Sequence, residues 1–443
     1  MAGQERQECG RHVKPICRKK DRSDISNAKR NGKMRLLKVD KIDEARSKLL
    51  DAAGEKVPDT EYTGFMESCG RILAQDIPAA ENVPAFRKST VDGYAVMAKD
   101  TQGVTDSIPV FLEVVGEVLM GQSPGIDIRE GQAVYVPTGG MLPDGADAVV
   151  MIEYVEKFDE NSIAVYDSVS PGRNVILEGE DLADGDVFLK KGTVLRPQEI
   201  GLMPSAGISE VPVFMPWSIS VISTGDEIVA AGQEMKKGQT RDINTYSLSA
   251  AAEKHGFRIT EKTAVKDGRE SVREAIRKAM SSSDVVLVSG GSSQGEKDFT
   301  AEVMDELSDG GVFTHGIAIK PGKPTIIGYD SKSSTILAGL PGHPVAALMI
   351  FELFIAWLYR KLTGQKEPVK TAARMTENIA SAGGKATCIL LELREGEDGI
   401  YDAIPVLGRS GIMTTMTRAD GYTVTGTDAE GLREGEIVAV TLF

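Results

Sequence analysis

The stretch DVVLVSGGSSQGEKD, from Asp284 to Asp298, indicates the fold of the central part of the chain. It begins with the apolar run Val285 to Val288, whose length and β-branched content favour a strand buried on both faces of a parallel sheet. The glycines that follow allow close approach of a ligand, and free N–H groups with the positive end of the next helix can surround an anion. Asp298 adds a carboxylate suited to a divalent cation beside phosphate. Taken alone, this loop is equally compatible with a simple turn.

Composition limits the classes of protein to consider. A length of 443 residues predicts two to four domains, and a net charge of −14 argues against nucleic acid and acidic membranes as partners. Cys9, Cys17, Cys69 and Cys388 form no paired framework, which favours the reducing cytoplasm. The longest apolar run, 345–358, contains a glutamate, so no membrane span is expected.

The chain divides into segments of different pattern. Residues 1–33 are basic and lack apolar periodicity, so we expect a disordered tail or residues that precede the true start at Met34; Cys9, His12 and Cys17 could in principle bind a metal. Helical patterns follow at 36–50 and 66–73. Residues from Tyr94 to about 176 form short strands of a small β-domain. Residues 182–216 are connecting material with one short helix.

From Ser218 onward, strands alternate with helices. Strands are predicted at 219–223, 259–265, 285–288, 317–319, 325–327 and 336–338, and helices at 244–255, 271–280 and 344–362. This alternation predicts a central doubly wound, mostly parallel α/β sheet. From Pro368 the chain returns to short strands, which predicts a second small β-domain.

Three predicted strands end in glycine-rich loops, at 224–227, 289–295 and 339–343. Since ligands bind at the carboxyl ends of strands in open α/β sheets, we expect these loops to meet at one edge. Glu227 and Asp298 would supply carboxylates for a metal, and Lys320 and Lys323 of KPGKP would supply positive charge. The pattern predicts a site for a phosphorylated ligand, a divalent cation and a second anion.

At this point the motifs resemble a known family. STGDEI, SGGSSQGEKD, AIKPGKP and GLPGHPVAAL, with STVDGYAV, VPTGGMLPDGADAVV and GEDL upstream, are similar to those of the molybdopterin molybdenumtransferases, whose animal relative is the E domain of gephyrin. The resemblance covers about Leu36 to Phe443. It implies an elongated helical linker and dimerisation domain (34–77 and 182–215), an inserted β-domain (78–181), an α/β pterin-binding domain (216–365) and a C-terminal β-barrel-like domain (366–443).

The resemblance also implies a reaction. A homodimer would transfer molybdate to adenylylated molybdopterin with Mg²⁺ and release AMP, at a site between the α/β domain of one subunit and the DGYA-bearing domain of the other. The implied catalytic residues are Asp92, Asp181, Glu227 and Asp298, of which Glu227 and Asp298 would bind the metal. The implied substrate-binding residues are Thr138, Thr224, Gly225, Asp226, Asp267, Ser289, Gly290, Gly291, Ser292, Gly295, Lys320, Pro321, Lys323, Pro341, Gly342, His343, Lys385 and Ser410. Without the resemblance, Asp92 would be a turn residue and Asp267 a helix cap.

Four positions depart from the family pattern. His343 replaces the usual Asn, Ala346 a common Ser, Lys385 a frequent Arg, and Ile176 an Arg found in many members. Lysine lacks the bidentate geometry of arginine, which matters at Lys385. Together, the four changes affect how the oxyanion is bound and admit tungstate as an alternative to molybdate. They also make His343 a candidate substrate contact.

Two other functions remain to be compared. The same α/β unit occurs in molybdopterin adenylyltransferases, although the additional β-domains and the DGYA segment argue against that activity. A non-catalytic pterin-binding scaffold would have no need of Asp92, Glu227, Asp298, Lys320 and Lys323. Expected partners are the adenylyltransferase and the enzymes that receive the cofactor.

Overall fold

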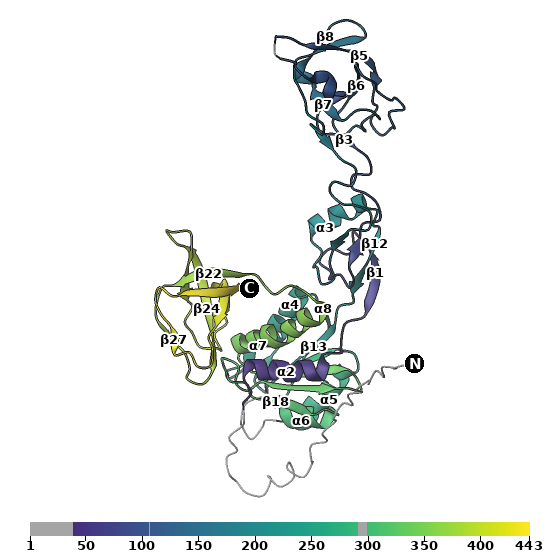
Figure 1. Ribbon diagram of the computed structural model, residues 1–443. Coiled ribbons are helices and arrows are strands. Elements are labelled where there is room, and N and C mark those ends of the chain that lie inside the picture. Colours follow the sequence, from purple (N-terminus) through teal and green to yellow (C-terminus); the bar gives the residue numbers. More distant parts are fainter. Residues whose placement is uncertain (1–38, 106, 291–298) are drawn as a thin grey trace, which may run out of the picture. The chain divides into compact units, whose positions relative to one another are not determined.

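The computed structural model describes residues 39–105, 107–290 and 299–443 (Figure 1). The expected tail at residues 1–33 lies outside this range. Among the described residues, no helix has both the length and the apolar character needed to cross a membrane.

The central sheet contains six strands in the order β16-β13-β17-β21-β20-β18. Their bounds are β13 (Ser218–Thr224), β16 (Arg258–Val265), β17 (Val285–Ser289), β18 (Val312–His315), β20 (Ile326–Asp330) and β21 (Thr335–Leu340). The first four in spatial order are parallel; β20 runs antiparallel to β21, and β18 runs antiparallel to β20. Every residue of β13, β17 and β21 is buried, as expected for β-branched strands covered on both faces. The predicted mostly parallel sheet is confirmed.

The strand predicted at 317–319 does not belong to the central sheet, so this prediction is wrong. The strand β19 (Ile319–Lys320) instead pairs in parallel with β24 (Ala386–Glu395) of the C-terminal sheet. The edge position of the central sheet is taken by β18, which the sequence did not reveal. Gly316, at φ +99°, separates β18 from β19 and accounts for this change of direction.

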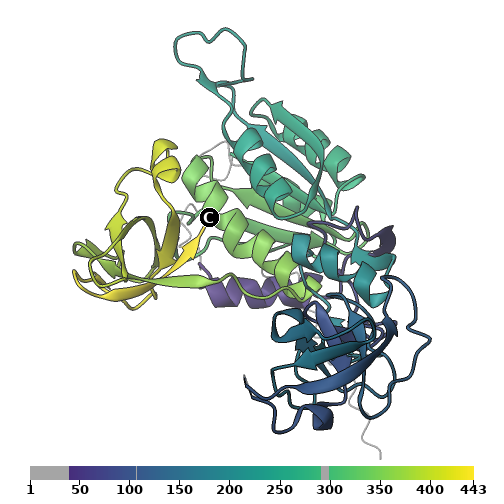
Figure 2. The ribbon, with the colours of Figure 1, turned by 90° about the horizontal axis from the view of Figure 1, so that it is seen from above.

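Helices cover both faces of the central sheet (Figure 2). One face packs against α4 (Asn244–Lys254), α2 (Ile42–Ala53) and a continuous helical segment made of α7 (Pro344–Ile350), the π-helical turn η5 (Phe351–Ala356) and α8 (Trp357–Thr363). The other face packs against α5 (Arg269–Met280) and α6 (Thr300–Leu307). The helices predicted at 244–255, 271–280 and 344–362 are confirmed.

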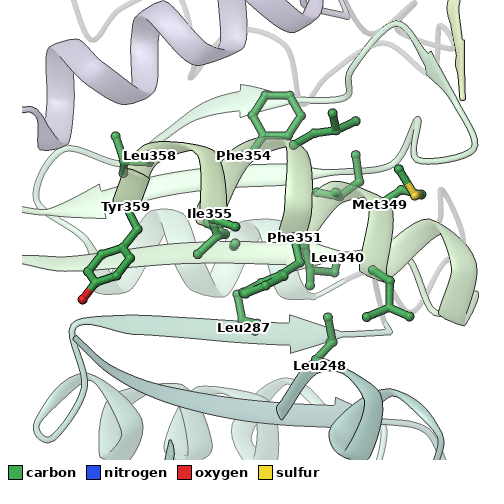
Figure 3. Close-up of a cluster of buried hydrophobic side chains, with 14 of the residues drawn as sticks. Leu248, Leu287, Leu340, Met349, Phe351, Phe354, Ile355, Leu358 and Tyr359 are labelled. Carbon is green, nitrogen blue, oxygen red and sulfur yellow. The ribbon is translucent and has the colours of Figure 1, made fainter. Parts of the chain in front are cut away.

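The larger core lies beneath α7, η5 and α8. Leu287 and Leu340 of the sheet lie there with Phe351 and Ile355 of the helical segment and Leu248 of α4 (Figure 3). Neighbouring positions on β17 alternate between the faces, so Val286 and Val288 belong to the opposite cluster. The helix α2 also belongs to the larger core, although the sequence grouped residues 34–77 with the connecting domain.

The connecting segments form a small core of their own. The strand β1 (Thr60–Gly64) pairs with β12 (Glu210–Phe214), β2 (Ile77–Pro78) pairs with β11 (Val187–Leu189), and α3 (Pro197–Leu202) is the predicted short helix. The helix predicted at 66–73 is wrong. Gly70 adopts φ +80°, and Ile72 and Leu73 form bridges with Val194 and Val213, which hold this segment extended.

Two further six-stranded sheets complete the described chain. The first has the order β7-β4-β6-β5-β9-β8, with β4 (Gly93–Val96), β5 (Val110–Glu117), β6 (Gln132–Val136), β7 (Ala148–Met151), β8 (Val155–Lys157) and β9 (Ser162–Val165). The second combines β19 and β24 with β22 (Lys370–Met375), β25 (Tyr401–Pro405), β26 (Gly421–Val424) and β28 (Ile437–Leu442). Two all-β sheets were expected here; the proposed domain limits stay a prediction.

Shorter elements connect these sheets. They are the pairs β3 (Lys88–Ser89) with β10 (Val175–Ile176), β14 (Ile228–Val229) with β15 (Thr240–Arg241), and β23 (Ile379–Ala380) with β27 (Gly431–Leu432), and the helix α9 (Thr414–Arg418).

Candidate functional site

Three strand tips of the central sheet meet at its carboxyl edge. A Cβ atom on Gly290, after β17, would lie 2.5 Å from the carbonyl oxygen of Thr224 at the end of β13. A Cβ atom on Gly342, after β21, would lie 3.7 Å from Cα of Gly290. The predicted convergence of these tips is therefore confirmed. Gly290 also adopts φ +105°, so both the backbone conformation and the close approach require glycine.

Asn244 joins two of these tips, although the sequence analysis placed it only at the start of the predicted helix 244–255. Its Nδ2 donates to Oγ of Ser289 at 2.6 Å and to the carbonyl of Gly342 at 2.8 Å. Ser289 in turn donates to the carbonyl of Pro341 at 3.3 Å. An amide side chain in the first turn of α4, which faces the strand tips, was the signal that could have identified Asn244. The bridge fixes the spacing of the β17 and β21 tips.

The start of α4 is held by a buried carboxylate. Oδ1 of Asp242 accepts the backbone N–H of Thr245 at 3.0 Å and the hydroxyl of Ser223 at 3.0 Å. Because Ser223 belongs to β13, this cap ties the helix to the strand that ends at Thr224. The helix that carries Asn244 is thereby positioned by the same strand edge that it bridges.

Two buried polar atoms at these tips have no hydrogen-bond partner among the described residues. They are Oγ1 of Thr224 and Oδ1 of Asn244. An unsatisfied buried group costs about 1–3 kcal/mol, and native proteins retain few of them. Their position at converging strand ends is the arrangement that a ligand-binding site produces.

Acidic residues of the predicted site lie in the loop that follows β13. Glu227 is exposed. The carboxylate of Asp226 accepts the backbone N–H of Asp267 at 3.2 Å, so the structure brings the predicted residues Asp226 and Asp267 together. The described residues contain no cluster of three or more His, Cys, Asp or Glu side chains able to hold a metal. The predicted residues Gly291, Ser292, Gly295 and Asp298 lie outside the described part of the chain.

Three predicted lysines lie in or next to the paired strands β19 and β24. Ile319 and Lys320 pair with Ala386 and Thr387, so Lys320 lies beside the strand that Lys385 precedes. The loop closes through the backbone N–H of Ile317, which donates to the carbonyl of Lys323 at 2.9 Å, with Pro321 between the two lysines. Among the described residues, none of the three ammonium groups forms an ion pair.

His343 contacts the C-terminal domain. Its Nδ1 lies 2.8 Å from Oγ of Ser410, and the backbone N–H of Val345 donates to the Ser410 carbonyl at 3.2 Å. Two residues that were predicted separately are thus hydrogen-bonded to each other. These two hydrogen bonds join the β21 loop to the segment at Ser410.

A second group of predicted residues lies in the inserted β-domain. Oδ1 of Asp92 accepts the backbone N–H of Thr138 at 2.7 Å and its hydroxyl at 3.0 Å. These hydrogen bonds, the backbone one first, lower the pKa of Asp92 below its ordinary value. Asp181 is exposed, and its backbone N–H donates to the carbonyl of Val83. Within the described residues, no hydrogen bond links this group to the strand tips.

Comparison with known proteins gives consistent matches along the chain. The families described as "MoeA N-terminal region (domain I and II)", "Probable molybdopterin binding domain" and "MoeA C-terminal region (domain IV)" match residues 41–207, 220–361 and 372–443. The chain is 36% identical over 350 residues to the molybdopterin molybdenumtransferase of Haemophilus influenzae, covering 78% of this chain and 83% of the relative. It is 30% identical over 398 residues to that of Bacillus subtilis, covering 88% and 91%.

Solved structures agree with these matches. The crystal structure of a molybdopterin biosynthesis MoeA protein from Pyrococcus horikoshii is similar with a TM-score of 0.78 and 31% identity, over 92% of this chain and all of that one.

Proposed function

The chain belongs to the molybdopterin molybdenumtransferase family, and from this premise we propose that it transfers molybdate to adenylylated molybdopterin and releases AMP. The observation that carries the proposal is the meeting of the three strand tips around Gly290, at the edge of the sheet where α/β proteins bind ligands.

The strand tips suit the phosphorylated part of this substrate. The absence of a Cβ atom on Gly290 lets its backbone pack against Thr224, and this brings backbone groups of the tips together where phosphate oxygens could bind. Ser289 and Thr224 contribute hydroxyl groups at the same edge, and Gly225, Asp226, Asp267 and Pro341 belong to the surrounding loops. The Asn244 bridge holds the tips in place, so little reorganisation is needed when the substrate binds.

Mg²⁺ fits the acidic side of the site. This ion typically binds through one or two carboxylates together with substrate phosphate oxygens, rather than in a cage made of protein alone. Glu227 offers one exposed carboxylate, and Asp298, outside the described residues, would offer a second. Bound there, Mg²⁺ would neutralise charge on the diphosphate as AMP leaves.

The lysines and His343 would hold the metal oxyanion. Lys320, Lys323 and Lys385 provide positive charge without ion-pair partners among the described residues. The hydrogen bond between His343 and Ser410 would set the position of the β21 loop against the C-terminal domain. Ammonium groups act as point charges and discriminate weakly between similar tetrahedral dianions, so we propose tungstate as an alternative substrate.

Asp92, Thr138 and Asp181 would reach the strand tips of a second subunit in a homodimer. Their lack of hydrogen bonds to the described strand tips of their own chain supports this arrangement. The proposal places the enzyme in the cytoplasm, with an adenylyltransferase supplying its substrate and molybdoenzymes accepting its product.

The reaction is tested by mixing purified protein with adenylylated molybdopterin, Mg²⁺ and molybdate and measuring AMP. We expect release that falls strongly in Lys320→Ala; no release with molybdate or with tungstate would refute the proposal. Formation of adenylylated product from ATP and free molybdopterin would instead favour an adenylyltransferase.

The shared site is tested by mixing two inactive variants. Heterodimers of Asp92→Ala and Lys320→Ala subunits contain one intact site if each site uses both chains. Recovery of AMP release after subunit exchange is expected. Continued inactivity of exchanged heterodimers would show that each site lies within one chain.

A further inference from the structure

A second cleft, of about 740 Å³, lies away from the strand tips. Its walls are formed by α2, by η5 and α8, and by the C-terminal sheet around Tyr422 to Thr427. The C-terminal residues Ala386 and Tyr422 belong to the same buried cluster as α2 and α8, so packed contacts join the elements that form the cleft.

One arginine of the cleft is held rigidly. The Nε and Nη2 atoms of Arg46 donate to the carbonyl of Leu353 at 3.0 and 2.8 Å, and its guanidinium lies 4.6 Å from the ring centroid of Trp357. Leu353 is part of the π-helical turn η5, a type of distortion that occurs frequently at functional sites. Burial, the largest cause, lowers the pKa of Arg46; Asp43, Tyr422 and Glu367 act in the opposite direction, and the charge of Arg360 lowers it further.

The second arginine, Arg360, makes no side-chain hydrogen bond or ion pair with the residues that the structure describes. The Nε atom of Arg360 is buried without a hydrogen bond, and its guanidinium forms no ion pair within the described residues. A partly buried guanidinium that faces a like charge is unfavourable unless an anion compensates it. Arg360 therefore contributes to the lining of the cleft a guanidinium that forms no ion pair within the described residues.

The acidic side chains of the cleft form no ion pair with Arg46 or Arg360 in the described part of the chain, although Asp43 and Glu367 favour the charged form of Arg46. Glu352 is paired with His255 at 2.7 Å. Asp43 and Glu367 are exposed and make no ion pair with either arginine in the described part of the chain. Tyr422 adds another donor, because burial raises its pKa to about 12 and its hydroxyl has no hydrogen-bond partner among the described residues.

We propose that this cleft binds a small molecule through a phosphate or carboxylate group. Arg360 and the hydroxyl of Tyr422 would contact the oxyanion, and Arg46 would add charge from its fixed position. Leu353, Trp357 and Val424 line the cleft and would contact the body of the ligand. The site is separate from the strand tips, and the reaction proposed there does not use it.

Tryptophan fluorescence offers a direct test, since the chain has only two tryptophans, Trp217 in the core and Trp357 in the cleft. In a Trp217→Phe background, inorganic phosphate and succinate are titrated separately at constant ionic strength. We expect a saturable change in Trp357 emission with at least one of them, and the anion that responds identifies the headgroup. Arg360→Gln should raise the half-saturating concentration roughly tenfold or more, since hydrogen bonds to charged groups are among the stronger ones.

Two controls keep the test specific. Lys320→Ala should leave the fluorescence titration unchanged, because that lysine belongs to the strand-tip site. Arg360→Gln should retain AMP release, which shows that the variant is folded. If it does not fold, Tyr422→Phe decides, and it should weaken binding several-fold. No saturable response to either anion, or a half-saturating concentration unchanged in these cleft variants, would overturn the proposal.

Discussion

Replacing Asn244 with alanine should reduce activity far more than stability. The substitution removes the two hydrogen bonds that join Ser289 and Gly342, at 2.6 and 2.8 Å. It also removes the buried Oδ1 atom, which has no partner. These two effects on the free energy of unfolding have opposite signs.

Their magnitudes nearly cancel. Two ordinary hydrogen bonds stabilise a protein by about 1–3 kcal/mol in total, and removing an unsatisfied buried oxygen recovers about 1–3 kcal/mol. We therefore expect the free energy of unfolding to change by less than about 2 kcal/mol. Catalysis has no such compensation, because a shift of about 1 Å in the tips can lower the rate about 100-fold.

The measurement combines AMP release with urea denaturation. Asn244→Ala should lower kcat/KM about 100-fold, equivalent to about 2.7 kcal/mol of transition-state stabilisation, while the urea midpoint changes little. Asn244→Asp keeps the size of the side chain but loses both donors, so it should be similarly inactive. Ser249→Ala is the matched control, since Ser249 is buried in the same helix and donates only to the carbonyl of Thr245.

The reasoning fails if Asn244→Ala keeps kcat/KM within about twofold of the parent protein while Ser249→Ala behaves the same way. A large loss of stability with normal activity in the remaining folded protein would also contradict it, because the bridge would then serve only folding.

Three other outcomes are expected. Gly290→Ala should abolish AMP release and should destabilise the protein clearly more than the control Gly256→Ala. A Cβ atom on Gly256 meets no atom within 4 Å, so that control costs about 1–2 kcal/mol for its positive φ alone. Urea denaturation of both variants measures the difference. Thr138→Ala removes the hydroxyl donor but keeps the backbone N–H, which is the larger cause, so it should raise the pKa of Asp92 only part of the way to its ordinary value, as an NMR titration would show. Because the pKa of Asp92 is lowered in the folded protein, the stability from this contact is present above 3.8 and is lost as the pH falls through the folded pKa, so the variant should lose less stability on acidification. Ser410→Ala removes a 2.8 Å hydrogen bond at an exposed position, so it should cost less than about 1 kcal/mol but raise the KM for molybdate; an unchanged KM would argue against a role in holding the β21 loop.

Several features follow from local sequence alone. The buried β-branched run Val285 to Val288 and the alternation of strands and helices predicted the parallel sheet, because side-chain periodicity directly records which faces are covered. The positions of the three glycine-rich tips follow from the same pattern, since parallel strands end at the same edge of a sheet.

Other features were decided only by tertiary structure. Whether Ile319 and Lys320 join the central sheet or pair with Ala386 and Thr387 depends on hydrogen bonds between residues far apart in sequence. The bridge from Asn244 to Gly342 likewise spans 98 residues. Local patterns reveal which residues form a strand or a helix, but the choice of partner among several compatible ones is made by packing, where burial and hydrogen bonding of the whole chain are satisfied together.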